Sequence, residues 1–370
     1  MTEAQPKPKR RILVAMSGGV DSAVAAARLL EGGDEVIGLT LHLWDASGAQ
    51  QVGRCCSAED REDARRVCDH LGIAHYVVDE RSSFRRQVVD PFVEAYRKGE
   101  TPSPCVHCNR SLKLGGLAEL ARQFGAEKVA TGHYARLRRD AQGLMRLHRG
   151  VDASKDQSYF LFGLPQTVLE CLEFPLGEWN KEQVRAEAQR YALPNADKKD
   201  SQELCFVPDG DVQGFVQRES GPSPQGEVVD LQGQVLARHQ GIAAFTVGQR
   251  RGLGFASGEA RYVLRILPDR QQVVVGGAED VVCLEAEGEG MQWREGFAPR
   301  APFEAEVQIR YRHRAAPARI VPLAPGSVRV EFQEAQRALT PGQALVVYAG
   351  DEVLGGGFIR AKQSRSADCA

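Results

Sequence analysis

Two groups of polar residues in this chain have types and spacings suited to chemistry, and the first is the loop at residues 16–24, MSGGVDSAV. An apolar run that predicts a buried strand precedes it, and a run that predicts a helix follows it. A glycine pair at such a junction lets several backbone N–H groups point at one spot beside the helix N-terminus, where a phosphate is favoured. Ser17, Asp21 and Ser22 add hydroxyls and a carboxylate. This set is suited to binding pyrophosphate and its Mg²⁺.

The second group consists of two segments that carry cysteines, residues 101–113 (TPSPCVHCNRSLK) and 198–206 (KKDSQELCF). We expect Cys108 and Cys205 to lie in exposed polar loops. Lysines and arginines stand near both in the sequence, and a nearby cation lowers the pKa of a thiol and favours the reactive thiolate. If the loop at residues 16–24 binds ATP, its combination with two reactive thiols suggests that a substrate oxygen is adenylated and then replaced by sulfur.

The pair Cys105 and Cys108 forms a CxxC motif, which alone fits a redox pair, half of a zinc site or two packed thiols. Zinc would require a second pair with comparable spacing. The remaining closely spaced cysteines, Cys55 and Cys56, are adjacent, which is a poor spacing for one tetrahedral ion.

The phosphate loop also has an alternative interpretation. In an ordinary strand-to-helix turn, Asp21 or Ser22 would cap the helix, but capping uses one polar residue and leaves the others without a role. The loop is neither a Walker A motif, because no Lys-Ser or Lys-Thr follows the glycines, nor a dinucleotide fingerprint. It resembles the SGGxDS signature of the PP-loop ATP pyrophosphatases, which cleave ATP between its α and β phosphates and transfer AMP to a substrate.

Length and composition describe a globular chain of about two or three domains. The 370 residues are 42% hydrophobic and 26% charged, and we find no apolar run long enough to span a membrane or serve as a secretion signal. Nine cysteines without such a signal favour thiol chemistry or packing over a disulfide framework and predict a cytoplasmic protein. The net charge of −2 predicts no general attraction to nucleic acid, but residues 110–149 hold nine Lys or Arg against three Asp or Glu. That segment is either a polyanion-binding surface or a solvated helix face.

Alternating strand and helix patterns over residues 11–134 predict an α/β domain with a parallel sheet covered on both faces. Ligands then gather at the carboxyl ends of the strands, where the phosphate loop, Leu41 and the Gly132-His133 pair would converge. After residue 221 the pattern changes to short β-branched runs, with a hairpin at 262–277 and a small β-barrel from residue 303 onward. We expect Arg310, Arg312 and His313 to lie on one of its strands.

Nine motifs in order make the chain resemble the bacterial tRNA-specific 2-thiouridylases, which place sulfur on the wobble uridine of certain tRNAs. They are AMSGGVDSAV, CCSAEDREDARRVC, TPSPCVHCN, KVATGHYA, RGVDASKDQSYFL, KKDSQELCF, TVGQRRGLG, IRYRH and TPGQALVVY. The resemblance covers residues 11–360. It implies an adenine-nucleotide α hydrolase-like PP-loop domain over residues 1–206, a β-rich central domain over 207–282 and a C-terminal β-barrel domain over 283–370.

The resemblance also implies roles for individual residues. Cys205 would receive a persulfide from a sulfur-carrier protein, and Cys108 would be the nucleophile that can pair with Cys205 as a disulfide. ATP would bind at Ala15, Met16, Ser17, Gly18, Gly19, Val20, Asp21, Ser22, Leu41 and Gly132. The anticodon loop of tRNA would contact Ser103, Pro104, Cys105, His133, Lys155, Asp156, Gln157, Arg310, Tyr311 and Gln343.

Two questions stay open at the level of sequence. The position of Cys105 is acidic in some members of the family, which argues against a role for its thiol as a nucleophile. Cys105, Cys108 and Cys205 together also suit an iron–sulfur cluster with one open iron position, and the sequence does not choose between such a cluster and a persulfide relay. His133 has an alternative role as a hydrogen-bonded residue at the end of a strand. The competing functions are another PP-loop enzyme, such as a tRNA lysidine synthetase or an amidating synthetase, and a non-enzymatic RNA-binding protein with a CxxC motif.

Overall fold

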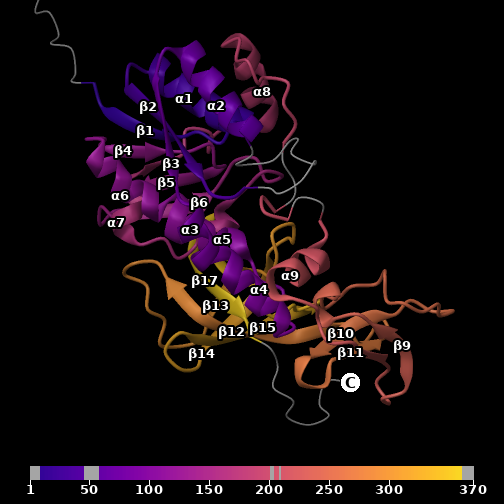
Figure 1. Ribbon diagram of the computed structural model, residues 1–370. Coiled ribbons are helices and arrows are strands. Elements are labelled where there is room, and N and C mark those ends of the chain that lie inside the picture. Colours follow the sequence, from indigo (N-terminus) through magenta and orange to yellow (C-terminus); the bar gives the residue numbers. More distant parts are fainter. Residues whose placement is uncertain (1–8, 46–57, 201–203, 208–209, 361–370) are drawn as a thin grey trace, which may run out of the picture. The chain divides into compact units, whose positions relative to one another are not determined.

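The computed structural model describes residues 9–45, 58–200, 204–207 and 210–360 of the chain (Figure 1). It divides into two compact units. The first comprises residues 1–85 and 107–208, and the second comprises residues 86–106 and 209–370. The second unit is therefore discontinuous in sequence. No helix within the described residues combines the length and the apolar character needed to cross a bilayer.

The first unit is built on the parallel sheet that the sequence predicts. The strand order is β3–β2–β1–β4–β7, and neighbouring strands run parallel. The order reverses at β1, which has β2 on one side and β4 on the other, and ligands bind at such a switch point in open α/β sheets. The strands are β1 (Arg11–Ala15), β2 (Glu35–His42), β3 (Ala74–Asp79), β4 (Lys128–Ala130) and β7 (Leu172–Glu173).

Helices cover both faces of this sheet, so Ile12, Leu13 and Val14 of β1 are fully buried. Helices α1, α2 and α8 pack together on one face, and α6 lies on the other, against β1 and β4 (Figure 1). Helix α8 begins where expected because Asn180 and Gln183 form a capping box, with two hydrogen bonds of 2.9 Å. The helices are α1 (Val20–Glu31), α2 (Ala58–Leu71), α3 (Arg81–Phe84), α6 (Gly115–Gln123), α7 (Gln166–Leu169) and α8 (Lys181–Arg190). A further helix, α5 (Pro104–Cys108), begins in the part of the chain assigned to the second unit and ends in the part assigned to the first.

Shorter elements connect these helices and strands. A hairpin of β5 (Ala135–Arg139) and β6 (Met145–Arg149) follows β4. The π-helical turns are η1 (Arg85–Val89) and η2 (Asn109–Lys113), and a 3₁₀ turn, η3, spans Ser158–Phe160.

The second unit starts at Arg86, within η1, and its first α-helix is α4 (Asp90–Arg97); after the interruption by the first unit, its next helix is α9 (Val212–Ser220). The two helices pack together, and the ring centroids of Phe92 and Phe215 are 6.1 Å apart. A sheet of order β10–β11–β8–β9 follows, in which β10 and β11 form the predicted hairpin. The elements of this part are β8 (Gly226–Val229), β9 (Val235–His239), η4 (Ile242–Ala244), β10 (Tyr262–Leu267), η5 (Pro268–Arg270) and β11 (Gln272–Gly276).

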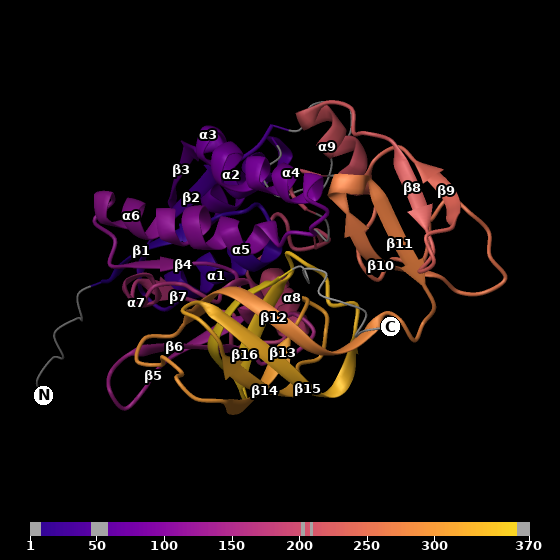
Figure 2. The same ribbon diagram turned by 90° about the horizontal axis from the view of Figure 1, so that it is seen from below.

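The predicted small barrel is present at the C-terminal end of the described chain (Figure 2). Its strands follow the order β12–β15–β14–β13–β16–β17, and β12 also pairs with β17, which closes the row. Closure leaves no unpaired edge in this row, and the inward side chains form a continuous apolar core. The strands are β12 (Val282–Trp293), β13 (Phe303–Gln308), β14 (Ala316–Pro322), β15 (Ser327–Arg337), β16 (Ala344–Ala349) and β17 (Glu352–Ile359).

One expectation about the barrel is wrong. Arg310, Arg312 and His313 do not lie on a strand, because β13 ends at Gln308 and the chain turns immediately afterwards. The Gln308 side-chain amide donates to the carbonyl oxygens of Arg310 (3.2 Å) and Tyr311 (2.7 Å). These side-chain hydrogen bonds stabilise the turn, so the carbonyl groups of Arg310 and Tyr311 have a partner without pairing to a neighbouring strand.

Candidate active site

The phosphate loop lies at the carboxyl end of β1 and leads into α1, as the sequence predicts. Gly19 is the N-cap residue and no side chain caps the helix, so the capping interpretation of Asp21 and Ser22 is wrong. Both residues lie in the first turn of α1. The Ser22 hydroxyl donates to the Gly19 carbonyl (2.9 Å) and lies 3.2 Å from the Ser17 hydroxyl, so the two serines hold the shape of the loop. Gly18 has φ +74°, and a Cβ there would stand 2.2 Å from the Asp60 carbonyl oxygen.

Gly132, just beyond β4, is brought directly against this loop. A Cβ at Gly132 would stand 2.7 Å from the Asp21 carbonyl carbon and the Ser22 nitrogen. Leu41, near the end of β2, is two residues beyond Leu39, which pairs with Ala15 at the end of β1. The carboxyl ends of β1, β2 and β4 therefore lie together, as the sequence predicts.

We expect Gly132→Ala to destabilise the fold by about 1–3 kcal/mol and to weaken ATP binding about tenfold, because the new methyl group displaces the backbone at the start of α1. Urea denaturation and isothermal titration with ATP measure the two effects. Gly116→Ala in α6 is the control, since its Cβ would meet the nearest atom at an ordinary 3.6 Å. Equal stability of the two variants would contradict the close packing described for Gly132.

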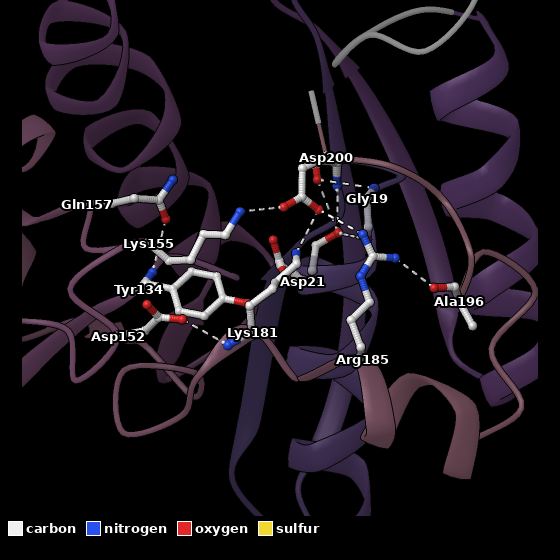
Figure 3. A network of polar contacts seen from close by, with 12 residues as sticks. Gly19, Asp21, Tyr134, Asp152, Lys155, Gln157, Lys181, Arg185, Ala196 and Asp200 are labelled. Carbon is white, nitrogen blue, oxygen red and sulfur yellow. Dashed lines mark hydrogen bonds and ion pairs between the residues drawn. The ribbon is translucent and has the colours of Figure 1, made fainter. Parts of the chain in front are cut away.

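Asp21 is the centre of a polar network beside the loop (Figure 3). Its carboxylate accepts hydrogen bonds from the Lys181 ammonium at 2.7 Å and from the Tyr134 hydroxyl at 2.8 Å. Lys181 is the first residue of α8, and Tyr134 follows β4. Burial, followed by the charge of Asp21, raises the pKa of Tyr134 well above its ordinary value, so this hydroxyl stays a donor.

A second carboxylate, that of Asp200, completes the network. It pairs with Lys155 (2.8 Å), Lys181 (2.8 Å) and Arg185 (3.0 Å) (Figure 3). Burial opposes its charged form, but the hydrogen bonds from Lys155 and Lys181 outweigh burial and lower the pKa of Asp200. Three cations, Lys155, Lys181 and Arg185, thus face the carboxylates of Asp21 and Asp200 beside the phosphate loop.

Residues 195–200 form a segment that is fastened to the phosphate loop and its neighbours. The Asn195 amide nitrogen donates to the Gly18 carbonyl oxygen at 3.0 Å. The Lys198 ammonium lies 2.6 Å from the Asp60 carboxylate and 2.5 Å from that of Asp63, both on α2. Burial lowers the pKa of Lys198, but its bonds to Asp60 and Asp63 outweigh that effect and raise it.

Sequence reasoning assigned no role to Tyr134, Lys181, Asn195 or Asp200. Tyr134 and Asp200 fall within quoted motifs, KVATGHYA and KKDSQELCF, but nothing in the motifs says what their side chains contact. Lys181 and Asn195 carry no signal of their own, because a lysine after a helix cap and an asparagine in a loop are common surface residues.

Cys108 is not in an exposed loop. It is the last residue of α5, only 5% of its surface is exposed, and the chain continues into the π-helical turn η2. Proline is favoured at the first position of a helix, so Pro104 was a signal for α5 that sequence reasoning missed. The next residue, Asn109, is also buried and its amide donates to the Phe160 carbonyl oxygen at 3.4 Å.

Cys205 is half-buried in a turn that an aromatic cluster holds in place. The ring of the adjacent Phe206 packs edge-on against Phe84 and Trp44, with centroids 5.6 and 6.5 Å away. Cys105, which belongs to the second unit, is half-buried as well. Cys55 and Cys56 lie outside the described residues.

Cys68 shows the contrasting environment of a packing residue. It is fully buried in α2, and desolvation raises the pKa of its thiol to about 12. Such a thiol stays protonated and unreactive at neutral pH.

Residues predicted to contact tRNA fall into separate groups. In the second unit, Ser103 and Gln343 come together: the Ser103 hydroxyl accepts from the Ala344 nitrogen (3.1 Å), and the Gln343 amide donates to the Thr101 carbonyl (2.9 Å). Pro104 is buried beside Ser103 at the start of α5. In the same unit, Arg310 and Tyr311 lie in the turn after β13.

The Lys155-Asp156-Gln157 run lies beside the polar network of the first unit. Asp156 is buried and accepts from the Gly150 nitrogen (2.9 Å) and from Ser158. The Gln157 side-chain oxygen accepts from the Tyr134 nitrogen at 3.0 Å. Asp156 and Gln157 thus hold the shape of this loop, and Lys155 reaches from it to Asp200.

His133 lies beyond the end of β4, where its Nδ1 is 2.7 Å from the Thr131 hydroxyl and its ring packs edge-on against Phe174. Burial and the positive charge of Lys113 lower its pKa to about 3 from an ordinary value of 6.5. The imidazole is therefore neutral at physiological pH.

This lowered pKa gives a testable pH dependence of stability. Between pH 6.5 and about 3 the unfolded state binds a proton at His133 and the folded state does not, so the free energy of unfolding falls as the pH falls through this window. We expect His133→Gln to lose less stability than the wild type between pH 7.5 and pH 5 in urea denaturation. Parallel losses in the two proteins would show that His133 does not titrate in this way.

The basic stretch at residues 110–149 is less available to a polyanion than its composition suggests. Ion pairs join Arg122 with Glu119, Arg136 and Arg138 with Glu178, Arg146 with Asp140, and Arg149 with Asp156. Acidic partners therefore neutralise much of the positive charge that the residue count indicates.

No group of three or more His, Cys, Asp or Glu side chains within the described ranges is arranged to hold a metal ion. The iron–sulfur cluster on Cys105, Cys108 and Cys205 stays a prediction. A single carboxylate beside a phosphate loop, as Asp21 provides, still fits Mg²⁺, which binds proteins through one or two carboxylates together with substrate phosphates.

Known proteins match this chain over most of its length. Family models described as "tRNA methyl transferase HUP domain", "tRNA methyl transferase PRC-barrel domain" and "Aminomethyltransferase beta-barrel domain" match residues 10–209, 213–277 and 286–359. A tRNA-specific 2-thiouridylase MnmA of Solibacter usitatus is 49% identical, over 95% of this chain and 100% of its own length. Those of Geobacter metallireducens (47%; 98% and 99%) and Sorangium cellulosum (49%; 96% and 94%) are similar over comparable lengths. The chain therefore belongs to the tRNA-specific 2-thiouridylase family.

Proposed function

We propose that this protein uses ATP to replace the O2 atom of the wobble uridine of tRNA with sulfur. One observation carries the proposal: the segment that binds the phosphate loop through Asn195 continues along the chain to Cys205. In this proposal, the same unit supplies both the loop that activates the oxygen and the thiol that replaces it. The full-length relatives named as 2-thiouridylases support the same reaction.

In the first step, uracil O2 attacks the α phosphorus of ATP, and pyrophosphate leaves. The backbone N–H groups at the start of α1 and the cations Lys181, Lys155 and Arg185 favour the negative charge that builds up on the leaving group. Asp21 would hold Mg²⁺, which supplies charge neutralisation at the phosphates when bound. The product is a uridine whose O2 carries AMP and has become a good leaving group.

In the second step, sulfur replaces the adenylated oxygen. A persulfide on Cys205, delivered by a sulfur-carrier protein, attacks C2 with its terminal sulfur, and AMP leaves with the oxygen. The Cys108 thiolate then attacks the Cys205 sulfur, which releases the 2-thiouridine and forms a Cys108–Cys205 disulfide. Alternatively, Cys108 first attacks the persulfide, forms the same disulfide and liberates sulfide, which attacks C2. Both routes require a dithiol reductant for the next turnover.

Residues of the second unit are proposed to recognise tRNA. Ser103 and Gln343 lie together, and Arg310 is exposed in the turn after β13. An exposed anticodon loop is the suitable target, because its unpaired bases can enter an active site, whereas bases paired in a duplex cannot. This activity places the protein in the cytoplasm with its tRNA.

The decisive assay combines tRNA, ATP, Mg²⁺ and a persulfide donor, and measures pyrophosphate together with thiolated nucleoside by mass spectrometry. We expect both products, each dependent on tRNA. A parallel reaction with S-adenosylmethionine tests the methyl transfer that the family-model descriptions mention. A methylated product, or the lack of tRNA-dependent pyrophosphate, would overturn the proposal.

A further inference from the structure

Residues 100–103, between α4 and α5, form a segment that is neither helix nor strand. Pro102 lies within it and Pro104 follows it, and proline has no backbone N–H to donate. The carbonyl groups of such a segment need hydrogen-bond donors from elsewhere in the chain. The shape of the segment therefore depends on the part of the second unit against which it packs.

Gln343 supplies donors to this segment. Its side-chain amide nitrogen lies 2.9 Å from the Thr101 carbonyl oxygen and 3.4 Å from that of Pro102. A side-chain amide has two N–H groups on its single nitrogen, and both contacts use that nitrogen. The donors of Gln343 are thus directed at the protein's own backbone.

The connection between β15 and β16, residues 338–343, holds Gln343 in place for this role. Its backbone pairs with β17: the Gly342 nitrogen donates to the Ile359 carbonyl (2.9 Å), and the Ile359 nitrogen donates to the Gln343 carbonyl (2.8 Å). Gly342 has φ +84°, and a Cβ there would stand 3.1 Å from the Thr101 carbonyl oxygen. Backbone pairing on one side and close packing on the other restrict where the Gln343 side chain can point.

Two further hydrogen bonds join the segment to the same connection and to β16. The Thr101 nitrogen donates to the Pro341 carbonyl at 2.8 Å, and the Ala344 nitrogen donates to the Ser103 hydroxyl at 3.1 Å. Ser103 is only 7% exposed. All of these residues belong to the second unit. The segment is therefore fixed near both ends, and the amide of Gln343 holds its middle.

We propose that Gln343 is a positioning residue for thiolation, because it fixes the segment that presents Ser103 and the start of α5 to the target uracil. The inference rests on the proposed function, since the family resemblance assigns Ser103, Pro104 and Cys105 to the target base. It changes the role of Gln343 itself, for which the resemblance implies a direct contact with tRNA. A base whose O2 must meet the α phosphorus of ATP tolerates displacement poorly: an error of about 1 Å can lower a rate ~10²-fold.

Gln343→Met tests this role, because it keeps the approximate size of the side chain and removes its donors. In the protein without tRNA, we expect the backbone amides of residues 100–103 to exchange hydrogen for deuterium at least ~10-fold faster than in the wild type. Mass spectrometry of peptides that cover residues 98–106 measures the exchange. Peptides from β14 of the same barrel are the reference, and their exchange should not change.

The activity of this variant should separate into rate and affinity. At saturating tRNA and ATP, we expect the single-turnover rate of pyrophosphate formation to fall at least ~10-fold, because the base is held less accurately. The Kd for tRNA, measured by fluorescence anisotropy, should stay within ~3-fold of the wild type, because phosphate contacts dominate the affinity for a nucleic acid. A general loss of structure would not produce this combination.

Gln333→Met is the matched control. Gln333 is exposed on β15 of the same barrel, so the same chemical change there should leave exchange, rate and affinity at wild-type values. Gln343→Asn provides a second test, since it keeps an amide on a shorter side chain that falls short of the Thr101 carbonyl. We expect it to behave as Gln343→Met does, and it decides the question if the methionine variant does not fold.

The outcomes separate this inference from the proposed function. Lack of tRNA-dependent pyrophosphate in the wild type would contradict the proposed function, whereas the exchange comparison still shows whether Gln343 fixes the segment. With an active wild type, unchanged exchange at residues 100–103 combined with weaker tRNA binding would overturn the positioning role and identify Gln343 as a direct tRNA contact. An unchanged single-turnover rate in Gln343→Met would overturn it as well.

Discussion

Replacing Cys205 with serine is expected to lower the formation of thiolated tRNA by at least ~10³-fold, because the hydroxyl cannot carry a persulfide. Release of pyrophosphate in a single turnover should continue, since adenylation of O2 uses the phosphate loop and no thiol. The measurement pairs a pyrophosphate assay with mass spectrometry of the digested tRNA. Loss of both products to the same extent would mean that Cys205 is needed for ATP chemistry or for folding.

Cys108→Ser distinguishes the two routes of sulfur transfer. If the Cys205 persulfide attacks C2 directly, this variant accumulates a tRNA–protein adduct through an S–S bond, which dithiothreitol releases as thiolated tRNA. If free sulfide is the attacking species, no adduct forms. Cys171→Ser is the control, since its hydroxyl retains a donor for the Thr167 carbonyl and the variant should behave as the wild type.

Lys181→Met is expected to lower kcat/KM for ATP by about 10²–10³-fold, the usual cost of losing a charged group that stabilises a transition state. The change also removes the cation that Asp21 and Asp200 share, so the negative charge of these two carboxylates repels the phosphates of ATP more strongly. Steady-state kinetics of tRNA-dependent pyrophosphate release measure the effect.

Lys199→Met is the matched control for this variant. Lys199 is exposed on the segment next to Asp200 and carries the same charge. A loss of similar size in both variants would indicate a general dependence on positive charge and contradict the specific role of Lys181.

The phosphate loop was predictable because its chemistry is contiguous in sequence. Ser17, Asp21 and Ser22 stand within six residues, between a strand and a helix that each have clear periodicity. Gly132 was also predictable, since parallel strands bring their carboxyl ends to one edge of the sheet. The polar and basic surroundings of Cys108 and Cys205 in the sequence drew attention to these cysteines, and the family resemblance then assigned their roles.

Side chains that reach the loop from far away in the sequence were not predictable. Lys181 is 160 residues from Asp21, and Asn195 is 177 residues from Gly18. Their contacts depend on how α8 packs against α1, which periodicity does not specify. The error at Arg310 has a similar cause: alternating residues continue past Gln308, but the amide of Gln308 turns the backbone first.

The discontinuity of the second unit has a consequence for biosynthesis. Residues 86–106 emerge from the ribosome early, but their partners are made much later: Gln343 is 242 residues beyond Thr101, whose carbonyl it binds. The apolar side chain of Phe92 likewise lacks its contact with Phe215 until residue 215 has been synthesised. Contacts between residues so far apart in the sequence slow folding. A segment that is synthesised before its partners exposes apolar surface, which can aggregate or bind chaperones. A chain truncated near residue 209 would leave residues 86–106 permanently without these partners, so the two units are best expressed as one polypeptide.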